Sequence, residues 1–476
     1  MDFLPATEPS VFTRLLKLVA PVKRSEVLTV SLLALNCFIL LTCYYVLKVV
    51  REPLILLGGG AELKAYASAG QTILLLGVVP AFGWLSSKVS RIRLMTTMQI
   101  IFIGCLVGFY VLAQAKAPIG LAFYLWLGIF NVLVVSNFWS FANDIYTEEE
   151  GKRLFAIIGV GASIGAILGA FVPHMLHASL GIHGLMLIAV VGLGVSILLY
   201  QVVDKRESMR KQEVAATKTP AAADVKDKKG GFALVIKDKY LRLLAGMLFV
   251  ATVINTTGEY VIGKMATDRS AAYAAEKATH APAAAPTPDG KPDPTADATV
   301  KAANKAAQDE YLSKFYSDYY GLVNLVSALL QGLLVARLLV ALGVRRSLFI
   351  MPVIVLGGWF ALILFVNMAV VRIEKTTENS LDYSLHNTLR QALFLPTSPE
   401  AKYKAKAAID TFFFRMGDVV AGLGIVFLFV EVLGLGVRSF AILNVALAAV
   451  WIFLAYRTGR MHDELVKQQE GRAPAA

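Results

Sequence analysis

The stretch FWSFANDIYTEEEGKRLFAIIGVGASIGAILGA, residues 138–170, decides the fold. Both of its ends are as apolar as membrane spans, yet three glutamates, a lysine and an arginine lie between Glu148 and Arg153. After this charged turn, Gly161, Gly165 and Gly169 recur every four residues and therefore share one face of a helix. Because small residues at this spacing let membrane helices approach closely, the glycines predict a tightly packed helix pair.

The same glycines do not form a nucleotide-binding loop. From Gly159 the spacing is GxGxxxG, whereas the dinucleotide fingerprint is GxGxxG and follows a strand. The chain has no Walker motif, so nothing in the sequence predicts ATP hydrolysis.

The composition predicts a membrane protein. Hydrophobic residues make up 57% of the chain, charged residues make up 17%, and the mean hydropathy is +0.62. A soluble domain is about half apolar and about a quarter charged. The net charge of +12 fits basic cytoplasmic loops beside anionic lipid, so no nucleic-acid partner is expected. No metal site or cofactor is expected, because the cysteines lie in apolar runs and the histidines are scattered: Cys37, Cys43, Cys105, His174, His177 and His183.

Apolar runs long enough to cross roughly 30 Å of hydrocarbon recur along the chain. They lie at 27–50, 66–86, 93–114, 118–141, 154–176, 180–203, 240–262, 314–342, 346–371, 408–433 and 437–457. A twelfth, more polar segment at 371–398 fits a helix that neighbouring helices shield from lipid.

We therefore predict an all-α membrane protein with twelve transmembrane helices in two six-helix halves. The N-terminal half is 1–203, the cytoplasmic linker is 204–235, and the C-terminal half is 236–476, with a flexible external insertion at 268–310 that is rich in alanine and proline. Two such halves are typical of a secondary transporter whose binding site lies between its repeats.

The distribution of basic residues predicts the orientation. With both termini in the cytoplasm, the inner loops and tail contain most of the loop cations, namely Lys88, Arg91, Arg93, Lys152, Arg153, Arg345, Arg346, Lys402, Lys404, Lys406, Arg457 and Arg460. The short outer loops contain only Lys116, Arg372, Lys375 and Arg438. Residues 1–25 are expected to form an amphipathic surface helix rather than a cleaved signal.

Charged residues within the spans are candidate substrate ligands, because charge is costly inside a membrane. Lys48 and Arg51 lie on one helix face at the end of the first span, and arginine suits bidentate phosphate binding. Snorkelling of these side chains to the interface is the alternative. Glu259 lies in the seventh span near Asn255, where we expect a polar cavity wall.

The charged turn after the fourth span has two interpretations. One is a solvated cytoplasmic loop, and the other is a gate whose acid–base pairs close the inner face of the protein. The gating residues would be Asp144, Glu148, Glu149, Lys152 and Arg153.

Three segments together resemble one family. YYVLKVVREPLIL, FWSFANDIYTEEEGKRLFAIIGVGASIGA and LFLPTSPEAKYKAKAAID are similar, in this order along the chain, to segments of the ATP/ADP translocases of plastids and intracellular bacteria. The resemblance implies a major-facilitator-type fold and exchange of nucleotides without hydrolysis. It places the family's functional cations at Arg51 and Lys406 and its seventh-span glutamate at Glu259. The family's fourth-span acid corresponds to Leu127, and Asp418 stands where a lysine is expected.

The expected function is secondary active transport of nucleotides, or of a related phosphorylated anion, by alternating access. In this mechanism Glu259 would bind a coupling proton or the polar end of the substrate. A proton-coupled transporter of another organic anion, metabolite or chelate is the alternative. An enzyme is not expected, because no cluster of acid, base and nucleophile is present. We expect a monomer in the bacterial inner membrane.

Overall fold

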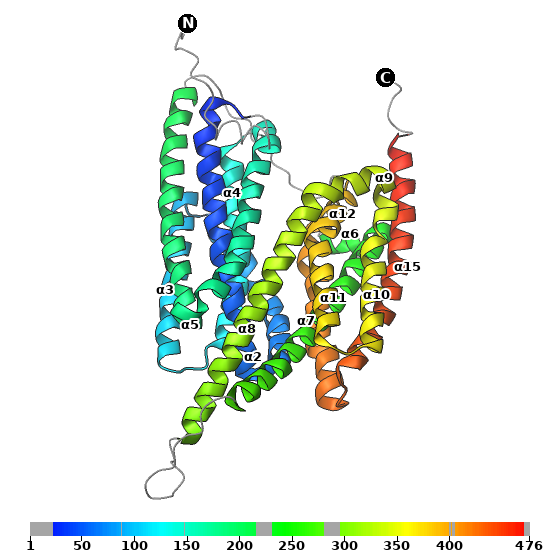
Figure 1. Cartoon of the computed structure of the whole chain (residues 1–476). Coiled ribbons are helices and arrows are strands. Elements are labelled where there is room, and N and C mark those ends of the chain that lie inside the picture. Colours follow the sequence, from blue (N-terminus) through cyan, green and yellow to red (C-terminus); the bar gives the residue numbers. More distant parts are fainter. Residues whose placement is uncertain are drawn as a thin grey trace, which may run out of the picture. The chain divides into compact units, whose positions relative to one another are not determined.

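The computed structural model describes residues 22–86, 88–146, 148–215, 231–279, 296–398, 401 and 405–470, and they are almost entirely helical (Figure 1). No strand occurs among these residues. The predicted surface helix falls largely on residues 1–21, which lie outside the described part. Residues 216–230 of the predicted linker lie outside it too, while helix α5 extends to Ala215 and helix α6 begins at Gly231.

The N-terminal helices follow the predicted spans. They are α2 (Arg24–Ser86), α3 (Arg91–Gln114), α4 (Gly120–Ile145) and α5 (Glu148–Ala215). The helical path breaks within α2 at Gly60, where φ is +75°, and within α5 at Gly181, where φ is +63°. Glycine adopts positive φ readily. The break at Gly60 falls between the first two predicted spans, and the break at Gly181 lies at the start of the sixth, 180–203.

The C-terminal helices include several π-helical segments, labelled η. The elements are α6 (Gly231–Lys237), α7 (Lys239–Thr279), α8 (Ala296–Leu329), η1 (Leu330–Val335), α9 (Ala336–Ser347), α10 (Ile350–Leu364), α11 (Met368–Leu381), η2 (Asp382–His386), α12 (Asn387–Ala392), α13 (Lys406–Ala408), η4 (Ile409–Phe413), α14 (Phe414–Val419), η5 (Val420–Val432) and α15 (Val437–Glu470). Consecutive elements from α11 to α12 continue one helix through the predicted tenth span.

Eight of the described helices are long and apolar enough to cross a membrane. Two of these candidate spans, Ser25–Leu85 and Arg153–Ser208, contain 61 and 56 residues. At about 1.5 Å per residue each is more than twice as long as a bilayer core of roughly 30 Å, and each is broken at a glycine. An arrangement in which both cross twice is consistent with the predicted twelve spans.

The described ends of the predicted insertion are helical, which differs from the sequence expectation. Residues 268–279 continue α7, and residues 296–310 form the start of α8. Lys277 Nζ and Glu310 Oε2 lie 2.8 Å apart, and the rings of Tyr273 and Tyr311 lie 5.5 Å apart. Alanine is the strongest helix former, so the alanine content that indicated an unstructured segment favours helix here. Residues 280–295 lie outside the described part.

The contacts divide the chain into two compact units. Unit 1 comprises the described residues of Met1–Val50, Val79–Ala117 and Leu127–Ala223. Unit 2 comprises those of Arg51–Val78, Pro118–Trp126 and Asp224–Ala476. Two segments that precede the predicted linker therefore group with unit 2, while the predicted boundaries at 203 and 236 remain a prediction.

The glycine face of α5 confirms the helix-packing prediction within unit 1. A side chain at Gly161, Gly165 or Gly169 would collide with the backbone carbonyl oxygen of Ala34, Phe38 or Thr42 on α2. The three carbonyls are also spaced by four residues, so two matched stripes meet backbone to backbone. Thr42 Oγ1 donates a hydrogen bond to the Gly165 carbonyl oxygen over 3.2 Å, across this contact.

We predict that Gly165→Ala destabilises the protein, because the added methyl group has no room against Phe38. Overpacking of this kind costs about 1–3 kcal/mol. The control is Gly159→Ala, since nothing lies within 4 Å of a side chain built there. Thermal unfolding of the purified protein in detergent measures the difference, and equal midpoints for the two variants would show that the α2–α5 contact is not close.

Candidate functional site

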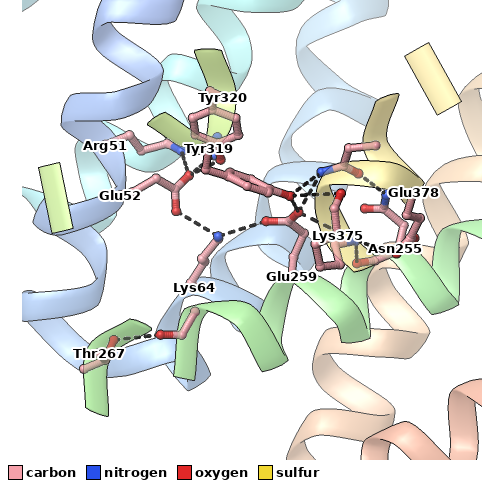
Figure 2. Close-up of polar contacts among 12 residues, drawn as sticks. Arg51, Glu52, Lys64, Asn255, Glu259, Thr267, Tyr319, Tyr320, Lys375 and Glu378 are labelled. Atoms are coloured by element: carbon pink, nitrogen blue, oxygen red, sulfur yellow. Dashed lines mark hydrogen bonds and ion pairs between the residues drawn. The ribbon is translucent and has the colours of Figure 1, made fainter. Parts of the chain in front are cut away.

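Six charged side chains of unit 2 form a connected network (Figure 2). Arg51, Glu52 and Lys64 come from α2, Glu259 comes from α7, and Lys375 and Glu378 come from α11. The chain reverses direction at the glycine break in α2, so that Lys64 returns to Glu52 although twelve positions separate them.

Glu52 holds the first part of the network and is fully buried. Its carboxylate accepts a hydrogen bond from Arg51 Nε at 3.1 Å and pairs with the same guanidinium through Nη2. The hydroxyl of Tyr320 donates to it over 2.9 Å, and Lys64 Nζ lies 2.8 Å from its other oxygen. Four polar contacts thus compensate the cost of burying this carboxylate.

Lys64 connects Glu52 to Glu259. Its ammonium lies 3.2 Å from Glu259 Oε2 and 5.3 Å from the centre of the Tyr316 ring. Figure 2 shows the lysine between the two carboxylates. A similar cation–π contact holds Arg51, whose guanidinium lies 4.5 Å from the centre of the Tyr124 ring.

Glu259 is the most exposed carboxylate of the network, with 22% of its side chain accessible. Besides Lys64, it lies 3.8 Å from Lys375 Nζ, and Asn379 Nδ2 donates to it over 3.2 Å. The Tyr319 hydroxyl is 3.4 Å away. Asn255 Nδ2 in turn donates to Asn379 Oδ1 over 2.9 Å, which fixes the orientation of that amide.

Lys375 is buried at the far end of the network. Its ammonium lies 3.0 Å from Glu378 Oε2 and donates to the carbonyl oxygen of Asn255 over 3.3 Å. A side chain at Gly258 would lie 3.1 Å from the lysine Nζ and 2.8 Å from the Trp359 ring. The absence of a side chain at Gly258 therefore leaves room for the Lys375 side chain beside α7 and Trp359 of α10.

The network has three cations and three carboxylates and divides into three principal pairs, Arg51–Glu52, Lys64–Glu259 and Lys375–Glu378. Removing one member of a buried pair leaves an uncompensated charge, which costs several kcal/mol. An arrangement of this kind is suited to binding an anion, because an incoming anionic group can replace a carboxylate as the partner of a buried lysine.

The sequence-predicted substrate ligands fall at three places. Arg51 and Glu259 belong to the network, and Asn255 borders it, because its carbonyl oxygen accepts a hydrogen bond from Lys375. Lys48 belongs to unit 1, where it is largely buried and its ammonium lies 5.2 Å from the centre of the Tyr45 ring. Lys406, in α13, donates to Gln391 Oε1 and lies beside the Phe394 ring, and these contacts do not include any of the six network residues.

The predicted gate is described only in part. The side chains of Glu148, Glu149 and Lys152 lie outside the described part. Asp144 is exposed near the end of α4. Arg153 makes a two-pronged pair with buried Glu26 of α2, at 2.5 and 2.8 Å, within unit 1. The gating role of these residues stays a prediction.

Sequence reasoning missed the two central lysines. Lys64 follows three glycines between predicted spans, and Lys375 was counted as an outer-loop cation, but both are buried. The available signal was the helical spacing of Lys375, Glu378 and Asn379, which places them on one face of a helix. Without knowledge of the neighbouring helices, this face gave no indication that it was buried.

Comparison with known proteins identifies the fold. A model of the Major Facilitator Superfamily matches residues 33–266, just under half of the chain. The ADP,ATP carrier protein 2 of Chlamydia trachomatis serovar D is 25% identical over 286 residues, which are 46% of this chain and 51% of the carrier, so the match spans about half of that relative.

Solved structures match over nearly the whole chain. The nucleoside transporter NupG has a TM-score of 0.57 at 13% identity, over 91% of this chain and 98% of its own. A bacterial homolog of the human lysosomal transporter Spinster, in an inward-facing conformation, has a TM-score of 0.54 at 13% identity, and the match covers 94% of this chain and 99% of that one. A peptide transporter POT in complex with sulfate has a TM-score of 0.53 at 13% identity, and the match covers 95% of this chain and 98% of that one. The chain therefore has a major-facilitator-type fold.

The matched family and these structures are membrane transporters rather than enzymes, which agrees with the expectation that this chain is not an enzyme.

We predict that Lys64→Met destabilises the protein by about 3–5 kcal/mol, because Glu259 loses its principal partner. Adding Glu259→Gln leaves two complete pairs with no excess charge and should recover at least about 1 kcal/mol. Thermal unfolding in detergent measures both effects.

The matched control is Lys264→Met on α7, whose pair with Asp268 is exposed and should contribute at most about 0.5 kcal/mol. If the double variant lost the sum of the two single losses, the two residues would not act as a pair.

Proposed function

We propose that this protein is a secondary active transporter that exchanges nucleotides, or a related phosphorylated anion, across a bacterial inner membrane by alternating access. The observation that carries the proposal is the pairing of two buried lysines, Lys64 and Lys375, with the partly exposed Glu259. The resemblance to ATP/ADP translocases and the 25% identity to the chlamydial carrier support nucleotides as the substrate class.

The geometry offers a mechanism for exchange. A substrate phosphoryl group would compete with the Glu259 carboxylate for the ammonium groups of Lys64 and Lys375, and Arg51 would add a bidentate contact. When the substrate leaves, Glu259 pairs with the lysines again. In the empty site both lysines remain paired, so no buried charge is uncompensated. A substrate must therefore bind the two lysines more strongly than the Glu259 carboxylate does.

The remaining predicted residues have supporting roles in the proposal. Lys48 and Asn255 would line the substrate path, and Lys406 would contact substrate at the cytoplasmic mouth. Rocking of the halves would make and break contacts at 144–153 and 402–410. Both termini would be cytoplasmic, and the functional unit would be a monomer.

A second candidate function is proton-coupled transport of another organic anion, metabolite or chelate. Buried Glu374 of α11 favours it, because no ion pair joins this carboxyl group to a cation among the described residues. A buried carboxyl group in such a setting binds a proton readily.

We predict that Arg51→Ala reduces uptake of labelled ADP or ATP into proteoliposomes at least about tenfold, because truncating a charged hydrogen-bond partner costs about 2–5 kcal/mol. Lys264→Ala, on exposed α7 surface, is the control and should transport at the wild-type rate. Unchanged uptake by the Arg51 variant would exclude a substrate-binding role for the guanidinium.

Loading the vesicles separates the two candidate functions. For exchange without an imposed pH gradient, labelled nucleotide should enter vesicles that contain unlabelled nucleotide and should not enter empty vesicles. Uptake of an organic anion into empty vesicles, driven by the gradient, would favour the second candidate. Entry of nucleotide into empty vesicles without a gradient would contradict both.

A further inference from the structure

Titratable side chains recur every four residues along the helix formed by α11, η2 and α12. They are Glu374, Glu378, Asp382, His386 and Arg390, which we term the tenth-helix stripe. At about 1.5 Å per residue the stripe extends over about 24 Å, most of the roughly 30 Å hydrocarbon core. The exposed residues of this helix carry no charge and include Ile373 at 68%, Tyr383 at 41%, Asn387 and Gln391.

A π-helical turn helps to keep the stripe on one face. In an α-helix with 3.6 residues per turn, each step of four residues rotates the side chain onward by about 40°. The segment Asp382–His386 is π-helical, and its wider turn reduces this rotation at the middle of the stripe. Glu374, Glu378 and His386 consequently all remain buried.

The buried groups have unused hydrogen-bonding atoms. In the described part of the chain, Oε1 of Glu374, Oε1 of Glu378 and Nε2 of His386 have no hydrogen-bond partner, although at most 5% of any of these residues is exposed. Such buried polar atoms are uncommon and mark a place where a proton or a water is bound. Glu374 packs directly against Gly358 of α10, where any side chain would collide with it.

Other charged groups face the stripe from the neighbouring elements. Lys375 attracts the carboxyl groups of Glu374, Glu378 and Asp382 electrostatically, and Glu259 of α7 repels the carboxyl group of Glu378. Arg390 interacts electrostatically with Asp382 and His386, and its Nε lies 3.5 Å from Asp410 Oδ1. Lys406 is the second cation that interacts with Asp410. From α15, the Trp451 ring packs edge-on against His386 at 5.6 Å. Among the described residues, Lys375 is therefore the cation that acts on Glu374, and it is paired with Glu378.

We propose that Glu374 binds a proton at neutral pH and that the tenth-helix stripe conducts protons between Glu374 and the Arg390–Asp410 pair. The proton leaves the Glu374 carboxyl group for the Glu378 carboxylate, passes to Asp382, is then taken up by a ring nitrogen of His386, and is finally released through water to the Asp410 carboxylate. Side chains four residues apart have Cβ atoms about 5–6 Å apart, so a water bridges each transfer.

Proton passage would be coupled to the substrate network through Lys375. When Glu378 takes up the proton it loses its charge, and its pair with Lys375 weakens. The lysine then becomes available to Glu259, 3.8 Å away, or to an anionic substrate. This step rests on the proposed transport function, whereas proton binding by Glu374 does not.

Infrared spectroscopy of the purified protein tests proton binding without any substrate. At neutral pH the wild type should show the carbonyl band of a protonated carboxyl group, and this band should be lost in Glu374→Gln. Glu464→Gln, at a carboxylate that is 57% exposed on α15, is the control and should leave the band unchanged. A band that persists in Glu374→Gln, or is absent from the wild type, would overturn the proposal.

Proteoliposomes with a pH gradient and labelled ADP test the conduction. Glu374→Gln and His386→Gln should each lower gradient-driven accumulation at least about tenfold, because a positioned proton-transferring group contributes about 100-fold or more. His386→Gln should retain gradient-free exchange within about twofold, since His386 packs against Trp451 and is influenced by Arg390 rather than by the six network residues. Accumulation that is unaffected in both variants, or a wild type that transports without responding to the gradient, would overturn the conduction.

If the wild type transported no nucleotide at all, the proposed function would fail on its own, and the infrared result would still decide whether Glu374 binds a proton.

Discussion

A charge inside a low-dielectric interior is stable only with a partner, and the core of unit 2 depends on this constraint. Six charged side chains from α2, α7 and α11 compensate one another there as three pairs. The Lys64–Glu259 pair joins α2 to α7, and Lys375, 3.8 Å from Glu259, joins α11 to α7. The same pairing makes the site responsive, because a substrate anion or a proton can exchange with one of its members.

Glycines supply the space that this charge network requires. The positive φ at Gly60 reverses α2 so that Lys64 meets Glu52, and the missing side chain at Gly258 admits Lys375. In unit 1, the stripe from Gly161 to Gly169 does the same for backbone contact with α2. In each case a residue without a side chain sets how closely helices approach, and the charged or polar groups then occupy the positions that this approach creates.

Much of the fold could be predicted from local signals. Apolar length located the spans, and glycine periodicity identified the α5 face that the structure confirms. Arg51 and Glu259 were identified because charge within an apolar run is conspicuous. Lys64 and Lys375 were not, because they lie near polar segments where a loop is the simpler interpretation. The helices at 268–279 and 296–310 were missed for a related reason, since alanine-rich sequence is compatible with both helix and disorder until a partner helix packs against it.

The sequence by itself determined a helical membrane protein, its span positions, its close-packing glycine face and two members of its charged network, because hydrophobicity and periodicity are local properties of the chain. Only the tertiary structure decided which charges meet. It paired Lys64 with Glu52 and Glu259, buried Lys375 beside Glu378, and aligned the tenth-helix stripe on a buried face. Pairing and burial depend on neighbours brought together by folding, and spacing along the chain does not specify those neighbours.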